Sequence, residues 1–143
     1  MFMGEFEHTV DDKGRLAIPF KIRGKFADGL VVTRGLDGCL FVFTTAEWTV
    51  LAEKIAKLPF TQRNARSFQR VMFSGATECQ LDSQGRFLLP SFLRSYAGID
   101  GETVIIGVST RLEIWAKDRW REVKAKVEEE SDSIAEQLAD LGI

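Results

Sequence analysis

The feature that most constrains this chain is a stretch that occurs twice, as VDDKGRLAIP at residues 10–19 and as LDSQGRFLLP at residues 81–90. At this offset of 71 positions, seven of the 24 residues in the range 4–27 are identical to their counterparts, and Arg23 with Arg94 is one such pair. An internal repeat of this kind indicates a tandem duplication. We therefore expect two structurally related halves.

Each copy predicts the same order of elements: strand, turn, strand, short helix, strand, strand and longer helix. Alternating and apolar runs predict the strands, Pro19 can open the short helix, and Thr44 with Glu47 forms a plausible capping box before the longer one. In the first copy the expected strands cover residues 5–10, 15–18, 30–34 and 39–43, and the expected helices cover 19–27 and 44–58. The second copy is expected to have strands at 102–109 and 112–116 and a helix from about Asp118.

The repeat also predicts how the chain is divided. The expected segments are a first repeat at 1–60, a connecting helix at 61–73, a second repeat at 74–130 and an acidic C-terminal tail at 131–143. Half a repeat has few strands and one apolar face, so two related halves can bury these faces against each other. We expect an α+β fold in which a tandem-duplicated β-barrel with flanking helices has pseudo-twofold symmetry within one chain.

The repeated turn combines an acid, a glycine and an arginine. Gly14 ends a three-residue connection that requires a left-handed backbone, which glycine adopts without a Cβ clash. Asp11 then faces Arg15 across the closing pair, where opposite charges steady the turn. The equivalent residues of the second copy are Asp82, Gly85 and Arg86. A structural role is the favoured interpretation of both aspartates.

The arginines of the two turns are candidates for DNA contact, with turn closure as the alternative. Each turn is expected to be the tip of a hairpin, and a two-stranded ribbon of this kind can enter the major groove. There the planar guanidinium of Arg15 or Arg86 at the tip can bridge O6 and N7 of guanine or fork onto a phosphate. Lys13 is predicted to add a phosphate contact. Lys21 and Arg23 lie on the short helix beside the turn and are weaker candidates, because cations on a short helix are often simply solvated.

The distribution of charge supports this prediction better than the net charge of −2 does. Residues 11–34 contain six cations and three acids, whereas residues 128–143 contain six acids and no base. A local field can attract a polyanion even when the whole chain is acidic. The arginines at 63, 66 and 70 form a further basic stripe, which can contact DNA or pair with the acidic tail of this chain or of a neighbour.

Other classes of protein are less consistent with the sequence. His8 is the only histidine, and in a strand it points away from Glu5 and Glu7. No glycine-rich phosphate loop and no metal-binding spacing is present, so we expect no enzyme, cofactor or metal. Cys39 and Cys79 are interpreted as reduced thiols, with a disulfide or metal role as the alternative.

No apolar run approaches the 18 or so residues of a membrane span, and the N-terminal stretch has neither a basic leader nor an apolar signal core. We expect no membrane association and a cytoplasmic location.

Two DxxxR elements, each followed by an apolar triplet and a proline, resemble those of the MraZ family, as does the opening MFMGEFEHTVDDKGRLAIP. The resemblance extends to about residue 130. It implies two AbrB-like (SpoVT-AbrB) domains of the swapped-hairpin type in one chain. It also implies a transcriptional regulator of the division and cell-wall gene cluster that binds direct repeats in its own promoter, localises to the cytoplasm and nucleoid, and assembles into rings.

By match of motif, the resemblance assigns DNA contact to Lys13, Arg15 and Arg86. The second copy has Ser83 and Gln84 in place of an acid and a lysine, so its turn has one cation fewer than the first. The alternative function is a protein-interaction module, in which an AbrB-like fold holds a protein partner as antitoxins do.

Overall fold

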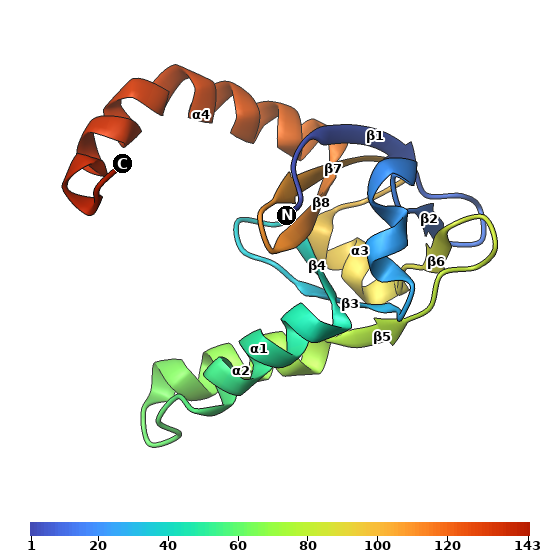
Figure 1. Cartoon of the computed structure of the whole chain (residues 1–143), viewed down its shortest axis with the longest axis horizontal. Helices are drawn as coiled ribbons and strands as arrows, with labels where there is room; N and C mark the ends of the chain where they lie inside the picture. Colours follow the sequence, from blue (N-terminus) through green and yellow to red (C-terminus); the bar gives the residue numbers. More distant parts are fainter.

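The strands of the computed structural model, which describes residues 1–143, form two antiparallel sheets. The larger sheet has, in spatial order, strands β1 (Glu5–Thr9), β7 (Glu102–Val108), β8 (Arg111–Ala116), β4 (Leu40–Thr44), β3 (Leu30–Arg34) and β5 (Thr77–Cys79). The smaller sheet pairs β2 (Arg15–Ala17) with β6 (Arg86–Leu88). Figure 1 shows this pair at one end of the molecule.

Helices flank the sheets and extend from them. They are, in chain order, the 3-10 helix η1 (Phe20–Phe26), α1 (Thr45–Ala56), α2 (Arg63–Gly75), α3 (Ser91–Ala97), α4 (Lys117–Gln137) and the 3-10 helix η2 (Ala139–Leu141). Helices α1 and α2 lie side by side as an arm that projects from the body, and α4 projects separately (Figure 1). The residues expected to form an acidic tail, 131–143, thus continue α4 and end in η2.

The two copies exchange strands. Strand β1 of the first copy pairs with β7 of the second, with Phe6 opposite Ile105. Strand β5 of the second copy pairs with β3 of the first, with Leu30 opposite Cys79. The prediction of a tandem-duplicated α+β fold with swapped hairpins is confirmed. The hydrogen-bonded order of the larger sheet is open, with β1 and β5 at its edges.

The main core lies between the two related halves. Leu16 and Ile18 of the first copy and their counterparts Phe87 and Leu89 of the second are at most 2% exposed and belong to one cluster of 18 buried residues. Burying a side chain of this size contributes about 1.5–3 kcal/mol, so these alternating apolar positions hold the copies together. A second, smaller cluster lies under α1, α2 and the start of α4, and includes Phe41, Phe43, Met72 and Trp115.

Local sequence signals account for the helix ends. Thr44 Oγ1 accepts a hydrogen bond from the backbone N–H of Glu47 at 3.2 Å, as expected for an N-cap. Pro19 and Pro90 precede η1 and α3, where the missing N–H costs no helical hydrogen bond. None of the helices combines the length and apolar character needed to cross a bilayer.

Candidate nucleic-acid interface

The first repeated turn is held by the carboxylate of Asp11. Its Oδ1 accepts hydrogen bonds from the backbone N–H groups of Lys13 and Arg15, both at 2.9 Å, and its Oδ2 accepts one from Arg15 Nε at 2.7 Å. The backbone N–H of Asp11 donates to the carbonyl of Arg15, and that of Gly14 donates to the carbonyl of Asp11. Gly14 has φ +81°, the left-handed conformation that the sequence predicts.

The second turn repeats this arrangement. Asp82 Oδ1 accepts from the backbone N–H groups of Gln84 and Arg86 at 2.9 Å, and Oδ2 accepts from Arg86 Nε at 2.9 Å. Gly85 has φ +76°. The structure thus places the acid, glycine and arginine of both copies as expected from their spacing.

These hydrogen bonds lower the pKa of both aspartates. For Asp11 the main cause is the backbone N–H of Arg15, and the Arg15 side chain and the N–H of Lys13 add to it. For Asp82 the main cause is the backbone N–H of Arg86. Each carboxylate is therefore a charged anchor for the turn, because its negative form accepts all of the hydrogen bonds.

The strands on either side of a turn do not pair with each other, which differs from the simple hairpin that the sequence suggests. Instead, β2 and β6 form a ribbon to which each copy contributes one strand, with Leu16 opposite Phe87. These two side chains are buried in the shared core, so the ribbon is anchored on its inner face. Backbone hydrogen bonds from Ile18 to Gly85 and from Leu89 to Gly14 extend the pairing to both turns.

The outer face of this ribbon presents both candidate arginines. Arg15 lies opposite Leu88, and Arg86 lies opposite Ala17, so the arginines are diagonal neighbours on one face. Diagonal neighbours in a sheet are about 7–8 Å apart, close to two steps of about 3.4 Å along a DNA strand. Arg86 Nη1 lies 3.9 Å from Asp11 Oδ2, which links the two turns directly.

Both guanidiniums remain accessible. The side chains of Arg15 and Arg86 are 32% and 26% exposed, and each is hydrogen-bonded to its own aspartate through Nε alone. The terminal nitrogens of Arg15 have no protein partner. The two terminal nitrogens of an arginine, Nη1 and Nη2, can donate together to O6 and N7 of a guanine or to two oxygens of a phosphate. The aspartates thus orient both arginines through Nε; the terminal donors of Arg15 stay free, whereas Nη1 of Arg86 also lies 3.9 Å from Asp11 Oδ2.

The side chain of Arg23 is not simply solvated, because it bonds to the protein backbone. Its Nε and Nη2 donate to the carbonyl of Ile18 at 3.2 and 2.9 Å, and its side chain packs directly over Gly85 of the other copy. Arg94 has the equivalent position: its Nε donates to the carbonyl of Leu89 at 3.1 Å, and its guanidinium lies over Gly14. Each copy therefore supports the turn of the other.

Arg94 is a residue of the site that the sequence reasoning did not single out. The signal was present, because Arg23 and Arg94 are the same residue in both copies, whereas the positions equivalent to Lys21 and Lys25 are Phe92 and Tyr96. The arginine that both copies keep on the helix after the ribbon strand therefore has a structural role, since it packs over the turn of the other copy.

The remaining basic candidates are exposed, except Arg66, which is half-buried. Lys13 and Lys21 make no side-chain hydrogen bond or ion pair, and both lie in the first copy close to the ribbon in sequence. The arginines at 63, 66 and 70 are on α2, which Figure 1 shows on the arm and away from the ribbon. Among them Arg66 donates to the carbonyl of Phe60.

Titratable groups with shifted pKa values outside the two turns include His8 and both cysteines. Burial lowers the pKa of His8, with a smaller effect from the charge of Arg23. Burial also raises the pKa of Cys39 and Cys79, and both thiols are free. No three His, Cys, Asp or Glu side chains are grouped as a metal ligand set.

Comparison with known proteins identifies the family. The model of the family described as "MraZ protein, putative antitoxin-like" matches the chain twice, at residues 1–71 and 72–141. The chain belongs to the MraZ family. MraZ proteins similar to it include those of Desulforamulus reducens (52% identical over 141 residues, 99% of each chain) and Moorella thermoacetica (50% over 143 residues, 100% of each chain). Both bear the name "Transcriptional regulator MraZ", a role that is not enzymatic.

Proposed function

We propose that this MraZ protein is a sequence-specific DNA-binding transcriptional regulator that reads direct repeats in the promoter of its own division and cell-wall operon. In this proposal the outer face of the β2–β6 ribbon enters the major groove, Arg15 and Arg86 contact bases or phosphates, and Lys13 adds a phosphate contact. Lys21 and Arg23 widen the basic surface. The protein acts in the cytoplasm, at the nucleoid, without a cofactor.

The observation that carries this proposal is the pair of oriented guanidiniums on one rigid face. Each turn is neutral overall, with two acids and two cations in residues 11–15 and one of each in residues 82–86. Recognition by this face therefore depends on the direction of its donors more than on total charge. The major groove, about 12 Å wide, admits a two-stranded ribbon.

A single copy that contacts few phosphates binds DNA weakly. We propose that copies of the chain assemble into a ring, so that neighbouring subunits occupy neighbouring repeats and their binding is strengthened by effective concentration. Acidic residues elsewhere on the chain then disfavour contact with DNA through other faces.

The direct test is a gel-shift titration of Arg15→Ala and Arg86→Ala against the DNA upstream of the chain's own gene. We expect Arg15→Ala to weaken binding by about 1–3 kcal/mol, or roughly 5- to 150-fold. Arg86→Ala should have a smaller effect, because Arg86 also faces Asp11 and has no lysine beside it. Lys21→Ala should have a smaller effect than Arg15→Ala.

Two controls separate recognition from charge and from folding. Arg15→Lys keeps the charge but loses the planar guanidinium. The ratio of its affinity for promoter DNA to its affinity for unrelated DNA should therefore fall. Arg121→Ala removes an arginine from exposed α4 and should leave affinity unchanged. Unchanged affinity of a folded Arg15→Ala protein would exclude the ribbon as the DNA site.

The alternative function is an antitoxin-like protein-interaction module. It is favoured by the part of α4 beyond Lys124, whose residues are exposed and form no side-chain hydrogen bond or ion pair with the rest of the protein. A stoichiometric complex with a different protein, together with no retention of DNA at low salt, would support this alternative over the DNA-binding proposal.

A further inference from the structure

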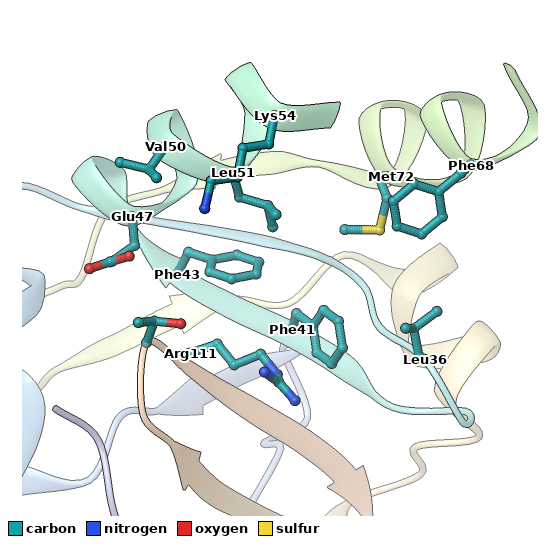
Figure 2. A pocket seen from close by; sticks show the side chains of 11 residues that line it. Leu36, Phe41, Phe43, Glu47, Val50, Leu51, Lys54, Phe68, Met72 and Arg111 are labelled. Atoms are coloured by element: carbon teal, nitrogen blue, oxygen red, sulfur yellow. The ribbon is translucent and has the colours of Figure 1, made fainter. Parts of the chain in front are cut away.

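A large apolar side chain, Leu88, lies on the outer face of the β2–β6 ribbon. The residue is 62% exposed, and its neighbours on this face are Arg15, Ala17 and Arg86. Other apolar side chains at the surface gather and face one another, as in a groove of about 330 Å³ between β4 and the helices α1 and α2 (Figure 2). Leu88 instead faces solvent beside the two guanidiniums that are proposed to contact DNA.

The register of the ribbon brings Leu88 close to Arg15, its direct partner in the pairing of β2 with β6. The backbone N–H of Leu89 donates to the carbonyl of Gly14. The next pair along the ribbon, Arg15 with Leu88, is therefore of the non-hydrogen-bonded type, in which side chains lie closer together. Leu88 Cδ1 is 3.5 Å from the position that a Cβ on Gly14 would occupy, so the leucine lies beside the first turn.

The major groove offers one kind of apolar group to a side chain on this face. Its base edges present hydrogen-bond donors and acceptors, apart from the C5 methyl group of thymine. A leucine placed against a phosphate would remove water from a charge without replacing the lost hydrogen bonds. An apolar side chain that enters the groove beside an arginine is therefore best matched by a thymine beside the base that the arginine contacts.

We infer that Leu88 determines specificity by contacting the C5 methyl group of a thymine next to the guanine bound by Arg15. The inference rests on the proposed DNA binding by the outer face of the ribbon and adds a second kind of base to those it distinguishes. The Cβ atoms of directly paired residues are about 4.5–5.5 Å apart, and successive bases are about 3.4 Å apart along a strand. Two such side chains can therefore contact adjacent bases.

The other end of the face lacks this contact. The position equivalent to Leu88 is Ala17, which lies opposite Arg86 and whose side chain ends at Cβ. One end of the ribbon thus distinguishes thymine beside guanine, and the other end distinguishes guanine alone. This asymmetry gives the contacted DNA segment a direction.

Deoxyuridine tests the inference, because it differs from thymidine only by the absent C5 methyl group. Each thymine of a duplex with one repeat from upstream of the chain's own gene is replaced in turn, and the affinity of the full-length chain is measured by fluorescence anisotropy. We expect one thymine at which the replacement weakens binding about 4-fold, as for the loss of one buried methyl-sized group. Leu88→Ala should bind the thymine and deoxyuridine duplexes equally at that position. Because Leu88 is exposed, this variant should keep its fold.

Exchange of the two outward positions sharpens the test. Ala17→Leu combined with Leu88→Ala keeps the composition of the face and moves the leucine beside Arg86. Deoxyuridine at the original position should then have no effect. In a duplex with thymine placed beside the guanine bound by Arg86, replacement of that thymine by deoxyuridine should weaken binding about 4-fold.

Leu36→Ala is the matched control. It removes a leucine of similar exposure, 54%, from the loop between β3 and β4, where the side chain lines the apolar groove (Figure 2). This variant should distinguish thymine from deoxyuridine as well as the wild-type chain does. Loss of the distinction in Leu36→Ala would overturn the assignment to the ribbon face.

The outcomes separate this inference from the DNA-binding proposal. Unchanged affinity of a folded Arg15→Ala protein would overturn the proposed ribbon site, and with it the role of Leu88. If Arg15→Ala weakens binding but no deoxyuridine replacement does, only the thymine contact is overturned. A 4-fold ratio that persists in Leu88→Ala would likewise overturn only the thymine contact, because another residue would then contact the methyl group.

Discussion

The two repeated turns have the same geometry and different chemistry. In both, one aspartate accepts two backbone N–H groups and an arginine Nε, at distances that differ by no more than 0.2 Å (2.7 and 2.9 Å for the Nε bond). Around this frame the sequences differ, because Asp12 and Lys13 are replaced by Ser83 and Gln84. The outward position beside the arginines is Ala17 in one copy and Leu88, which is 62% exposed, in the other.

This difference shows which part of the turn is required by the fold. The aspartate, glycine and arginine define the backbone, so both copies keep them. The residues between them point into solvent, where substitution costs little stability. The pseudo-twofold face is therefore chemically asymmetric, and it distinguishes the two ends of the DNA segment that it is proposed to contact.

The largest expected effect is a loss of stability when the turn glycines are replaced by alanine. Comparing the two losses tests whether the two turns are equally constrained. Gly14→Ala should cost about 1–2 kcal/mol, because alanine is strained at positive φ. Gly85→Ala should cost more, about 2–4 kcal/mol, because its Cβ would also displace the Arg23 guanidinium from the Ile18 carbonyl. Urea unfolding of the purified variants measures both values.

Gly24→Ala is the matched control for these substitutions. No atom lies within 4 Å of the position that its Cβ would occupy, so its stability should stay the same or rise slightly. Equal losses for Gly14→Ala and Gly85→Ala would mean that Arg23 moves aside without cost and does not support the turn.

An intermediate effect, on the salt dependence of DNA binding, is expected when the residues that differ between the turns are replaced. Lys13→Ala should reduce the slope of log affinity against log salt concentration by about 0.9, because one phosphate contact is lost. Gln84→Lys should increase this slope by a similar amount and make the second turn resemble the first. Fluorescence anisotropy with labelled promoter DNA over a salt series gives the slopes.

Ser83→Ala changes the same turn without changing charge and should leave the slope unaltered. If Gln84→Lys also leaves it unaltered, the second turn does not approach a phosphate, and recognition rests mainly on the first.

The smallest expected effect is on the stability of the protein in acid, to which Asp11 and Asp82 should contribute equally. The pKa values of Asp11 and Asp82 are lowered below the ordinary 3.8, so their contribution is complete above pH 3.8 and is lost as the pH falls through the lowered values. Asp11→Asn and Asp82→Asn should therefore each flatten the loss of stability in acid. Urea midpoints measured as a function of pH test this, and a flattening in only one variant would contradict the equivalence.

Much of the candidate site could be predicted from the sequence because its determinants are local. The spacing of Asp11, Gly14 and Arg15 specifies a turn through contacts within five residues, and the repeat indicates that a second such turn exists. The pairing of β2 with β6 could not be predicted in this way. Alternation shows that Leu16 and Phe87 are buried, but it does not say which strand lies beside which.

The role of Arg23 was hidden for the same reason. Its side chain packs over Gly85, which is 62 residues away in the chain. Helix propensity and the charges of neighbouring residues cannot predict a contact between residues so far apart. The comparison between copies does report it, since Arg94 occupies the equivalent position. In a duplicated chain, identity between copies marks what the architecture needs, and divergence marks where function can differ.

The shared ribbon has a consequence for how the protein is made. Strand β2 leaves the ribbon incomplete until β6, which begins 71 residues later, has been synthesised. At about 5–20 residues per second, the nascent first half waits about 4–14 s on the ribosome with Leu16 and Ile18 uncovered. Co-translational folding of this chain is therefore governed by the arrival of its second half, and a prematurely terminated product would expose the interior of the native protein.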